Sequence, residues 1–135
     1  MKATTTLRYG LRLMVNMGKN YQKGPIPLRR IAKGEQIPIK YAEKIISLLL
    51  RAGLVRSVRG KEGGYLLSYQ LNKIKLLDIF KALDGEIYLV NCVVNPQVCK
   101  RAKYCEARGL WQLLSENWKK ILNRLTLKDL INREG

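Results

Sequence analysis

The stretch Ala52-Gly53-Leu54-Val55-Arg56-Ser57-Val58-Arg59-Gly60-Lys61-Glu62-Gly63-Gly64-Tyr65 decides the fold of this chain. Gly53 suits the left-handed position just past the end of a helix. Residues 54–58 alternate and contain β-branched side chains, which predicts a strand. Three glycines in residues 59–64 permit the positive φ angles of a tight turn, and residues 65–69 predict the returning strand. The stretch is therefore predicted to be a β-hairpin that directly follows a helix.

Three helices are predicted before the hairpin. The first covers residues 4–17, with threonines at its start and Gly18 as its expected stop. The second begins near Pro27, and residues 34–36 are expected to form a turn. The third runs from Pro38 to about Ala52, and its predicted inner stripe consists of Ile39, Ala42, Ile45, Ile46 and Leu49. Two helices joined by a short turn and followed by a hairpin predict a winged helix-turn-helix.

Three further helices are predicted after the hairpin. Residues 75–84 form the first of them and Gly85 closes it, whereas residues 86–105 lack a clear period. A long helix follows over residues 106–125, and Thr126 caps a last short one. The long helix carries a broad apolar stripe of Trp111, Leu114, Trp118, Ile121, Leu122 and Leu125. The stripe predicts a homodimer interface, with packing against the N-terminal helix as the alternative.

The expected fold is mainly α with a small β-hairpin wing: a winged helix-turn-helix plus a long C-terminal dimerisation helix. Residues 1–73 are predicted to be the DNA-binding domain. Residues 74–105 are predicted to hold a linker helix and a loop with all three cysteines, and residues 106–135 the dimerisation helix and a C-terminal helix.

The charge of the chain points to a polyanionic partner. Its 26 Lys and Arg against 10 Asp and Glu give a net charge of +16. Residues 1–73 hold 15 of the basic residues and three of the acidic ones, so the excess lies mainly in the predicted DNA-binding half. Such a surface attracts nucleic acid and releases its counterions, although RNA and anionic lipid remain alternatives at this point.

Several function classes are disfavoured by what the sequence lacks. It contains no histidine, no Walker-type glycine motif and no recognisable nucleophile–base pair, so we do not expect an enzyme. It has no apolar run of about 18 residues and no apolar segment typical of a signal peptide, so we expect a cytoplasmic protein without a membrane span.

Three cysteines, Cys92, Cys99 and Cys105, fall within 14 residues. An odd number of clustered cysteines in an intracellular chain favours metal binding or redox chemistry over a disulfide framework. Thiolates suit both iron–sulfur clusters and zinc, and a thiol switch or three unligated thiols are the other readings of the residues.

Four segments in this order resemble the IscR/NsrR-like iron–sulfur family of winged helix-turn-helix transcriptional regulators, and the likeness is strongest to its IscR branch. The segments are residues 7–12, residues 39–45, residues 52–65 and the three cysteines. The resemblance implies a dimeric repressor or activator that binds a palindromic operator in double-stranded DNA. The DNA-binding residues that it implies are Pro38, Lys40, Tyr41, Glu43, Lys44, Arg59, Gly60 and Lys61.

The chemistry of these residues agrees with such a role. Lys and Arg bind guanine edges and phosphates, Glu43 can accept from cytosine, and a narrow minor groove attracts an arginine such as Arg59. The alternative for each lysine is a solvated surface charge, and Tyr41 could instead be a core residue at the edge of its helix.

The resemblance also implies that Cys92, Cys99 and Cys105 hold an iron–sulfur cluster, 2Fe-2S in preference to 4Fe-4S, with zinc as the alternative. One branch of the family places a histidine three residues after the last cysteine, where this chain has Arg108. Another supplies an aspartate from the partner's opening helix, where this chain has Arg8. Neither arginine can ligate iron as a cation, so the fourth position is left to another group, to an exogenous thiol or water, or to an open iron. Glu106 is the candidate nearest in the sequence, and Asp84 and Glu86 precede the loop.

The leading hypothesis is a regulator that senses cluster status, redox state or nitric oxide and controls genes for iron–sulfur cluster biogenesis. In this hypothesis, cluster binding orders residues 86–105 and so shifts the recognition helices of the dimer. The alternative is a cluster-free or zinc-binding basic nucleic-acid-binding regulator of the same fold.

Overall fold

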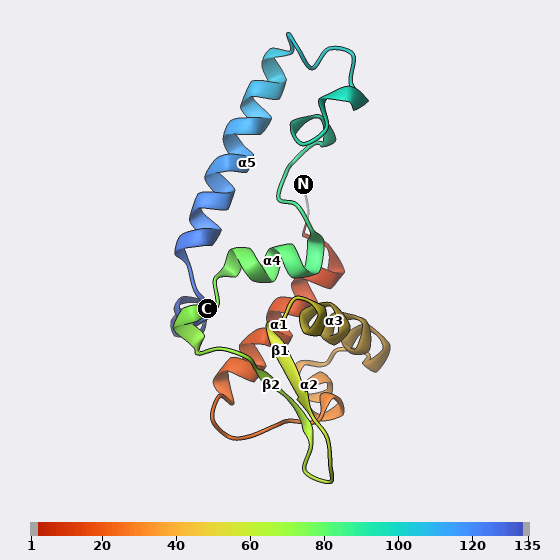
Figure 1. Ribbon diagram of the computed structural model, residues 1–135, viewed down its shortest axis with the longest axis vertical. Helices are drawn as coiled ribbons and strands as arrows, with labels where there is room; N and C mark the ends of the chain where they lie inside the picture. The colour runs from red at the N-terminus through yellow and green to blue at the C-terminus, as the bar shows by residue number, and fades with distance from the viewer. Residues whose placement is uncertain (1–2, 134–135) are drawn as a thin grey trace.

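The computed structural model describes residues 3–133 and is mainly helical with one two-stranded antiparallel hairpin, which confirms the expected fold class (Figure 1). The first half contains α1 (Thr5–Lys19), α2 (Leu28–Glu35), α3 (Ile39–Arg51), β1 (Val55–Val58) and β2 (Gly64–Leu67). The second half contains the 3-10 turn η1 (Leu71–Lys73), α4 (Leu76–Asp84), the 3-10 turns η2 (Asn91–Val93) and η3 (Pro96–Val98), α5 (Glu106–Arg124) and α6 (Leu127–Asn132).

Helix α1 lies at the centre and contacts α2, α3, α4 and α6. Thr4 caps it, because its hydroxyl accepts a hydrogen bond from the Leu7 amide at 3.1 Å. The expected stop at Gly18 is wrong, since the helix continues to Lys19 and Asn20 takes the C-cap. Gly18 is buried instead, and a Cβ there would lie 2.4 Å from the Ile131 side chain of α6. This glycine therefore serves helix packing.

The helix-turn-helix is formed by α2 and α3. The expected turn over residues 34–36 is shorter than predicted, because α2 continues to Glu35 and only Gln36 adopts the left-handed conformation, with φ of 56°. Helix α3 follows its predicted bounds closely, with Pro38 and Ala52 as its caps. Ile39 is 40% exposed and does not join the inner stripe, because it occupies the first position of the helix.

The wing is fastened to the rest of the fold at its base. Its strands pair from Val55 opposite Leu67 to Val58 opposite Gly64, so β2 starts one residue earlier than expected. Ile26 and Tyr65 exchange two backbone hydrogen bonds of 3.0 and 2.8 Å, which joins β2 to the residue before Pro27. A Cβ at Gly64 would lie 2.3 Å from the Ile26 carbonyl carbon, so only glycine fits this approach.

Two parts of the molecule differ in how they pack. The body, which comprises α1–α4, η1, β1, β2 and α6, holds most of the buried apolar side chains. The arm, which comprises residues 86–105 and α5, stands away from the body in Figure 1 and contacts it mainly through α4. Backbone hydrogen bonds join Leu76 to Leu125 at 2.9 Å and Leu127 to Ile74 at 2.8 Å, so the chain returns from the arm to the body at α6.

Candidate DNA-binding interface and cysteine segment

The predicted DNA-binding residues form two exposed groups. Lys40, Tyr41, Glu43 and Lys44 lie in the first turns of α3 and are exposed, and Pro38 precedes them as the N-cap. Arg59, Gly60 and Lys61 form the tip of the wing, where Gly60 has a φ of 116°. The two groups belong to one packed unit, because α3 contacts β1 and the Leu54 amide donates to the Leu49 carbonyl at 3.1 Å.

Two exposed arginines that the sequence reasoning missed lie near the wing base. Arg29 and Arg30 are in the first turn of α2, a few residues after Ile26, which pairs with β2. The first helix of a helix-turn-helix commonly crosses the DNA backbone, so their position in the sequence was the available signal. They add two exposed positive charges at the start of α2, close in the chain to the residue that pairs with β2.

Tyr41 is neither a core residue nor a freely solvated one. It is 45% exposed, and its ring meets the Tyr9 ring of α1 edge to face, with centroids 5.7 Å apart and an interplanar angle of 85°. The guanidinium of Arg12 lies 5.3 Å from the centroid of the same Tyr9 ring. The recognition helix is thus tied to α1 through aromatic contacts.

The cysteines occupy three different parts of the arm. Cys92 is half-buried in η2, Cys99 is exposed just after η3, and Cys105 is half-buried at the N-cap of α5. Glu106 is exposed in the first turn of α5. Within residues 3–133, no three Cys, Asp or Glu side chains are close enough to hold a metal ion. The thiols suit an iron–sulfur cluster or zinc chemically, but the fold does not bring them together.

Three contacts fasten the cysteine segment to the inner side of α5. The Arg108 Nε donates to the Cys92 carbonyl at 2.8 Å, so this side chain supports the loop rather than offering a ligand. The Ser115 hydroxyl accepts from the Leu89 amide at 3.2 Å and donates to the Trp111 carbonyl at 2.8 Å. Lys119 and Glu86 form an ion pair of 3.9 Å at the surface.

The outer side of α5 is apolar and exposed. The single stripe predicted from the sequence is divided, because Leu122 is buried and Trp111 is half-buried on the inner side. The outer stripe consists of Leu110, Leu113, Leu114, Trp118 and Ile121. Exposed apolar stripes of this extent on a helix mark an association surface.

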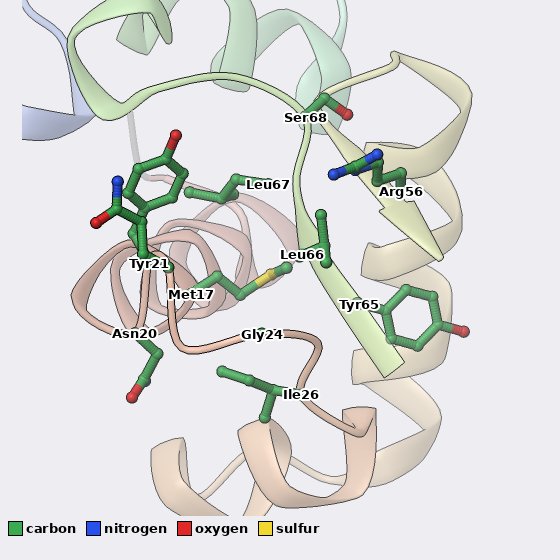
Figure 2. Close-up of a pocket in the computed structure, with 11 residues that line it drawn as sticks. Met17, Asn20, Tyr21, Gly24, Ile26, Arg56, Tyr65, Leu66, Leu67 and Ser68 are labelled. Carbon is green, nitrogen blue, oxygen red and sulfur yellow. The ribbon is translucent and has the colours of Figure 1, made fainter. Parts of the chain in front are cut away.

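A pocket of about 350 Å³ lies between the end of α1 and the wing (Figure 2). Met17 and Leu67 lie on its inner side, and Arg56 and Ser68 lie at the opposite end from Tyr21. It contains none of the predicted DNA-binding or ligand residues.

No helix within residues 3–133 combines the length and the apolar character that a membrane crossing requires.

A basic winged helix-turn-helix, joined to a helical arm, defines the class of the molecule as a DNA-binding transcriptional regulator. The chain belongs to the Rrf2 family, described as iron-dependent transcriptional regulators, which matches residues 3–133. It is 34% identical to the HTH-type transcriptional regulator IscR of Klebsiella pneumoniae strain 342 over 99% of this chain and 82% of the relative. Membership of this family also confirms that the chain is a regulator and not an enzyme.

Solved structures agree with this assignment. The global cysteine regulator CymR of B. subtilis superposes with a TM-score of 0.81 at 34% identity, covering 100% of this chain and 99% of that one. T. potens IscR superposes with a TM-score of 0.79 at 28% identity, covering 97% of this chain and 86% of that one. The expected resemblance to an IscR-like regulator family is therefore confirmed.

Proposed function

We propose that this regulator acts in the cytoplasm as a homodimer on a palindromic operator, and that Cys92, Cys99 and Cys105 sense iron–sulfur status. The observation that carries the proposal is the construction of the arm. One helix, α5, is fastened to the three-cysteine segment on its inner side and presents an apolar stripe on its outer side. A change at the cysteines would therefore act on the helix that sets the spacing of two DNA-binding bodies.

The two exposed groups of residues divide the work on DNA. Lys40, Lys44 and Glu43 at the start of α3 have the chemistry to contact base edges and phosphates in the major groove. Arg59 and Lys61 at the wing tip suit the minor groove or the adjacent backbone. Pairing of two outer stripes across a two-fold axis would present two such surfaces to two half-sites.

The cysteine segment would hold an iron–sulfur cluster through Cys92, Cys99 and Cys105, with 2Fe-2S favoured over 4Fe-4S and Glu106 as the fourth ligand. When bound, such a cluster supplies a group that responds to redox state or nitric oxide. Because no three possible ligands lie together among the described residues, the three thiols must move closer to share one ligand. The first part of the segment is held on α5 by Arg108 and Ser115, so the movement would fall on residues 93–105 and on α5.

The regulated genes would be those for iron–sulfur cluster biogenesis, and the alternative is a cluster-free or zinc-binding regulator of the same fold. One observation favours the alternative. Arg108 stands where a family branch has a histidine ligand, and its guanidinium hydrogen-bonds the Cys92 carbonyl.

The deciding experiment is an absorption spectrum with iron, sulfide and zinc analysis on anaerobically purified protein. Visible thiolate-to-iron bands with iron and acid-labile sulfide are expected, and Cys99→Ala should lose them while Ser57→Ala should not. Zinc without sulfide, or no metal, would contradict the cluster. Equal DNA affinity of metal-free and metal-loaded protein on every operator would contradict sensing.

The DNA side is tested separately with Arg59→Ala. We expect it to weaken specific binding by about 1–3 kcal/mol, the usual magnitude for a lost groove contact. Fluorescence anisotropy with a selected duplex and a scrambled one measures the effect. An equal loss on both duplexes would reduce Arg59 to a phosphate contact.

A further inference from the structure

We infer that Tyr9 and Arg12 of α1 are positioning residues for DNA recognition. Together with Glu35 and Tyr41 they form a brace, which fixes the first turn of α3 against α1 and the end of α2. The inference rests on the proposed reading of DNA by α3, and it assigns a role to two side chains that are not among the predicted DNA contacts.

One end of the brace joins α1 to α2. The Arg12 guanidinium donates to the Glu35 carbonyl and lies 3.9 Å from the Glu35 carboxylate. The Asn16 amide donates to the other oxygen of that carboxylate at 2.9 Å. Glu35 is the last residue of α2, so these bonds hold the end of α2 and the turn that leads into α3.

The other end joins α1 to α3 through aromatic rings. Arg12 lies 5.3 Å from the Tyr9 ring centroid, within the range of a cation–π contact. Tyr9 in turn meets Tyr41 in the edge-to-face geometry that aromatic quadrupoles favour. One guanidinium thus links the turn before α3 to the ring that contacts α3.

The first turn of α3 needs such support because it lacks the usual local stabilisers. Its N-cap, Pro38, makes no side-chain capping hydrogen bond, and the first turn contains no acidic residue. Lys40 instead places a positive charge at the positive end of the helix dipole. Residues 39–41 are all exposed, so burial does not fix them either. Tyr41 is held instead by its edge-to-face contact with the Tyr9 ring.

The exposed lysine and the missing cap of this turn both suit contact with DNA. A lysine at a helix N-terminus destabilises the free protein but is available for phosphate or base contact. The brace compensates for the missing N-cap hydrogen bond, because it holds the first turn of α3 through side chains of α1. Recognition therefore depends on α1 residues that need not touch DNA.

The test uses the full chain and a duplex selected from a random library by the wild-type protein, with a scrambled duplex of equal length. Tyr9→Ala and Arg12→Ala are expected to lower affinity for the selected duplex by about two- to tenfold, the range that one aromatic or cation–π contact supports. Affinity of Tyr9→Ala for the scrambled duplex should stay within about twofold, because nonspecific binding follows total charge and this variant keeps it. Arg12→Ala should lose no more affinity for the scrambled duplex than Lys19→Ala does, because each removes one positive charge. Tyr9→Phe, which keeps the ring, should restore selectivity.

Two further measurements separate positioning from other effects. Lys19→Ala, an exposed charge on the last turn of α1, should weaken binding to both duplexes equally. Losses from Tyr9→Ala and Tyr41→Ala should not add in the double variant, because both remove the same ring–ring contact. Additive losses, or an unchanged selected-duplex affinity in a folded Tyr9→Ala protein, would overturn the brace.

A measurement without DNA keeps the brace distinct from the proposed function. Hydrogen exchange of the amides of residues 42–46 should be faster in Arg12→Ala than in the wild type and in Lys19→Ala. Unchanged exchange would overturn the brace whatever the DNA result. If the wild type selects no duplex, the proposed function fails, while faster exchange would still establish that Arg12 supports the start of α3.

Discussion

The body and the arm of this molecule differ in where they place their apolar residues. The body places its apolar side chains inside, around α1, where Leu13, Met14 and Ile45 are fully buried. Among residues 3–133, the arm holds eight of the twelve exposed large apolar residues, including Trp118 at 45% exposure. Only Ile87, Ala102, Ser115 and Leu122 are buried within it. The body thus buries its apolar residues within itself, whereas the arm leaves an apolar surface exposed, which is the surface of the proposed dimer contact.

This difference indicates that most of the internal packing of the molecule lies in the body. The body has enough internal packing to hold α3 and the wing in a fixed relation. The arm is held to itself by a few hydrogen bonds. Under the proposed function, its order would therefore be linked to protein concentration and to what its cysteines bind. The proposed sensor in the arm would change that region without unfolding the DNA-binding surface of the body.

The largest expected effect comes from breaking the outer stripe of the arm. Trp118→Glu would place a charge in the proposed dimer contact, and we expect a monomer whose body remains folded. Loss of the second half-site should lower operator affinity by roughly a hundredfold or more, because bivalent binding is lost. Sedimentation analysis and DNA binding, with circular dichroism for the fold, measure these outcomes.

The matched control is Asn123→Glu, an exposed polar position on the same helix away from the outer stripe. It should leave both the dimer and operator binding unchanged. A dimeric Trp118→Glu protein would show that the outer stripe is not the association surface and would remove the main contrast between arm and body.

The next effect concerns the base of the wing in the body. Gly64→Ala would drive a Cβ into the Ile26 carbonyl at a φ of 157°, so the two backbone bonds of Ile26 and Tyr65 should break. We expect a loss of about 2–3 kcal/mol in the free energy of unfolding, the usual scale for backbone strain with a clash. Chemical denaturation measures it.

Gly53→Ala is the control for this substitution. Gly53 also has a positive φ, of 77°, but a Cβ there meets nothing within 4 Å. It should therefore cost only the conformational strain, about 1 kcal/mol. Equal losses for the two glycines would mean that the close approach of Ile26 does not hold the wing.

Local sequence patterns predicted most elements of the body, whereas contacts between residues distant in the sequence were not predicted. Helices of the body, the hairpin and the last short helix follow local patterns, so their bounds agree within a few residues. Gly18 and Glu35 departed from prediction because side chains distant in the sequence decide their surroundings: Ile131 packs on the first, and Asn16 binds the second. No local pattern contains such contacts, and the tertiary structure overrides propensity there.

The candidate site was predicted unevenly for the same reason. Exposed residues at the start of α3 and at the wing tip follow directly from the position of a helix and a turn. The brace links Tyr9, Arg12, Glu35 and Tyr41, which are up to 32 positions apart in the sequence, so no spacing rule reveals it. Likewise, the attachment of Arg108 to the Cys92 carbonyl depends on how a loop without periodicity folds back on α5.

A smaller effect would sharpen the comparison inside the arm. Ser115 is 2% exposed, and Ser115→Ala would leave the Leu89 amide without its acceptor. We expect a loss of about 1 kcal/mol, the usual value of one hydrogen bond, with faster exchange of the Leu89 amide and no change in α3. Ser47→Ala, on the exposed side of α3, is the control and should be neutral or slightly stabilising. Faster exchange throughout α3 in Ser115→Ala would mean that arm and body unfold together.

The smallest effect concerns the point where the chain returns from the arm to the body. Thr126 and Asp129 form a capping box, in which the Asp129 carboxylate accepts from the Thr126 amide at 2.9 Å and from its hydroxyl at 3.1 Å. The Thr126 amide bond, followed by the hydroxyl bond, lowers the pKa of Asp129 below its ordinary value of 3.8. The folded state therefore favours the carboxylate. Its contribution to stability is present above the unfolded pKa and is lost as the pH falls through the lower folded value.

Asp129→Asn should accordingly be less stable than the wild type at pH 7, and the difference should shrink below about pH 4, where the wild-type carboxyl also becomes neutral in the unfolded chain. Urea denaturation at pH 7 and pH 3 measures the two differences. Glu116→Gln in α5 removes one negative charge without such a pair of hydrogen bonds and is the control. A difference for Asp129→Asn that is the same at both pH values would mean that ionisation of the Asp129 carboxyl does not contribute to the stability of the cap.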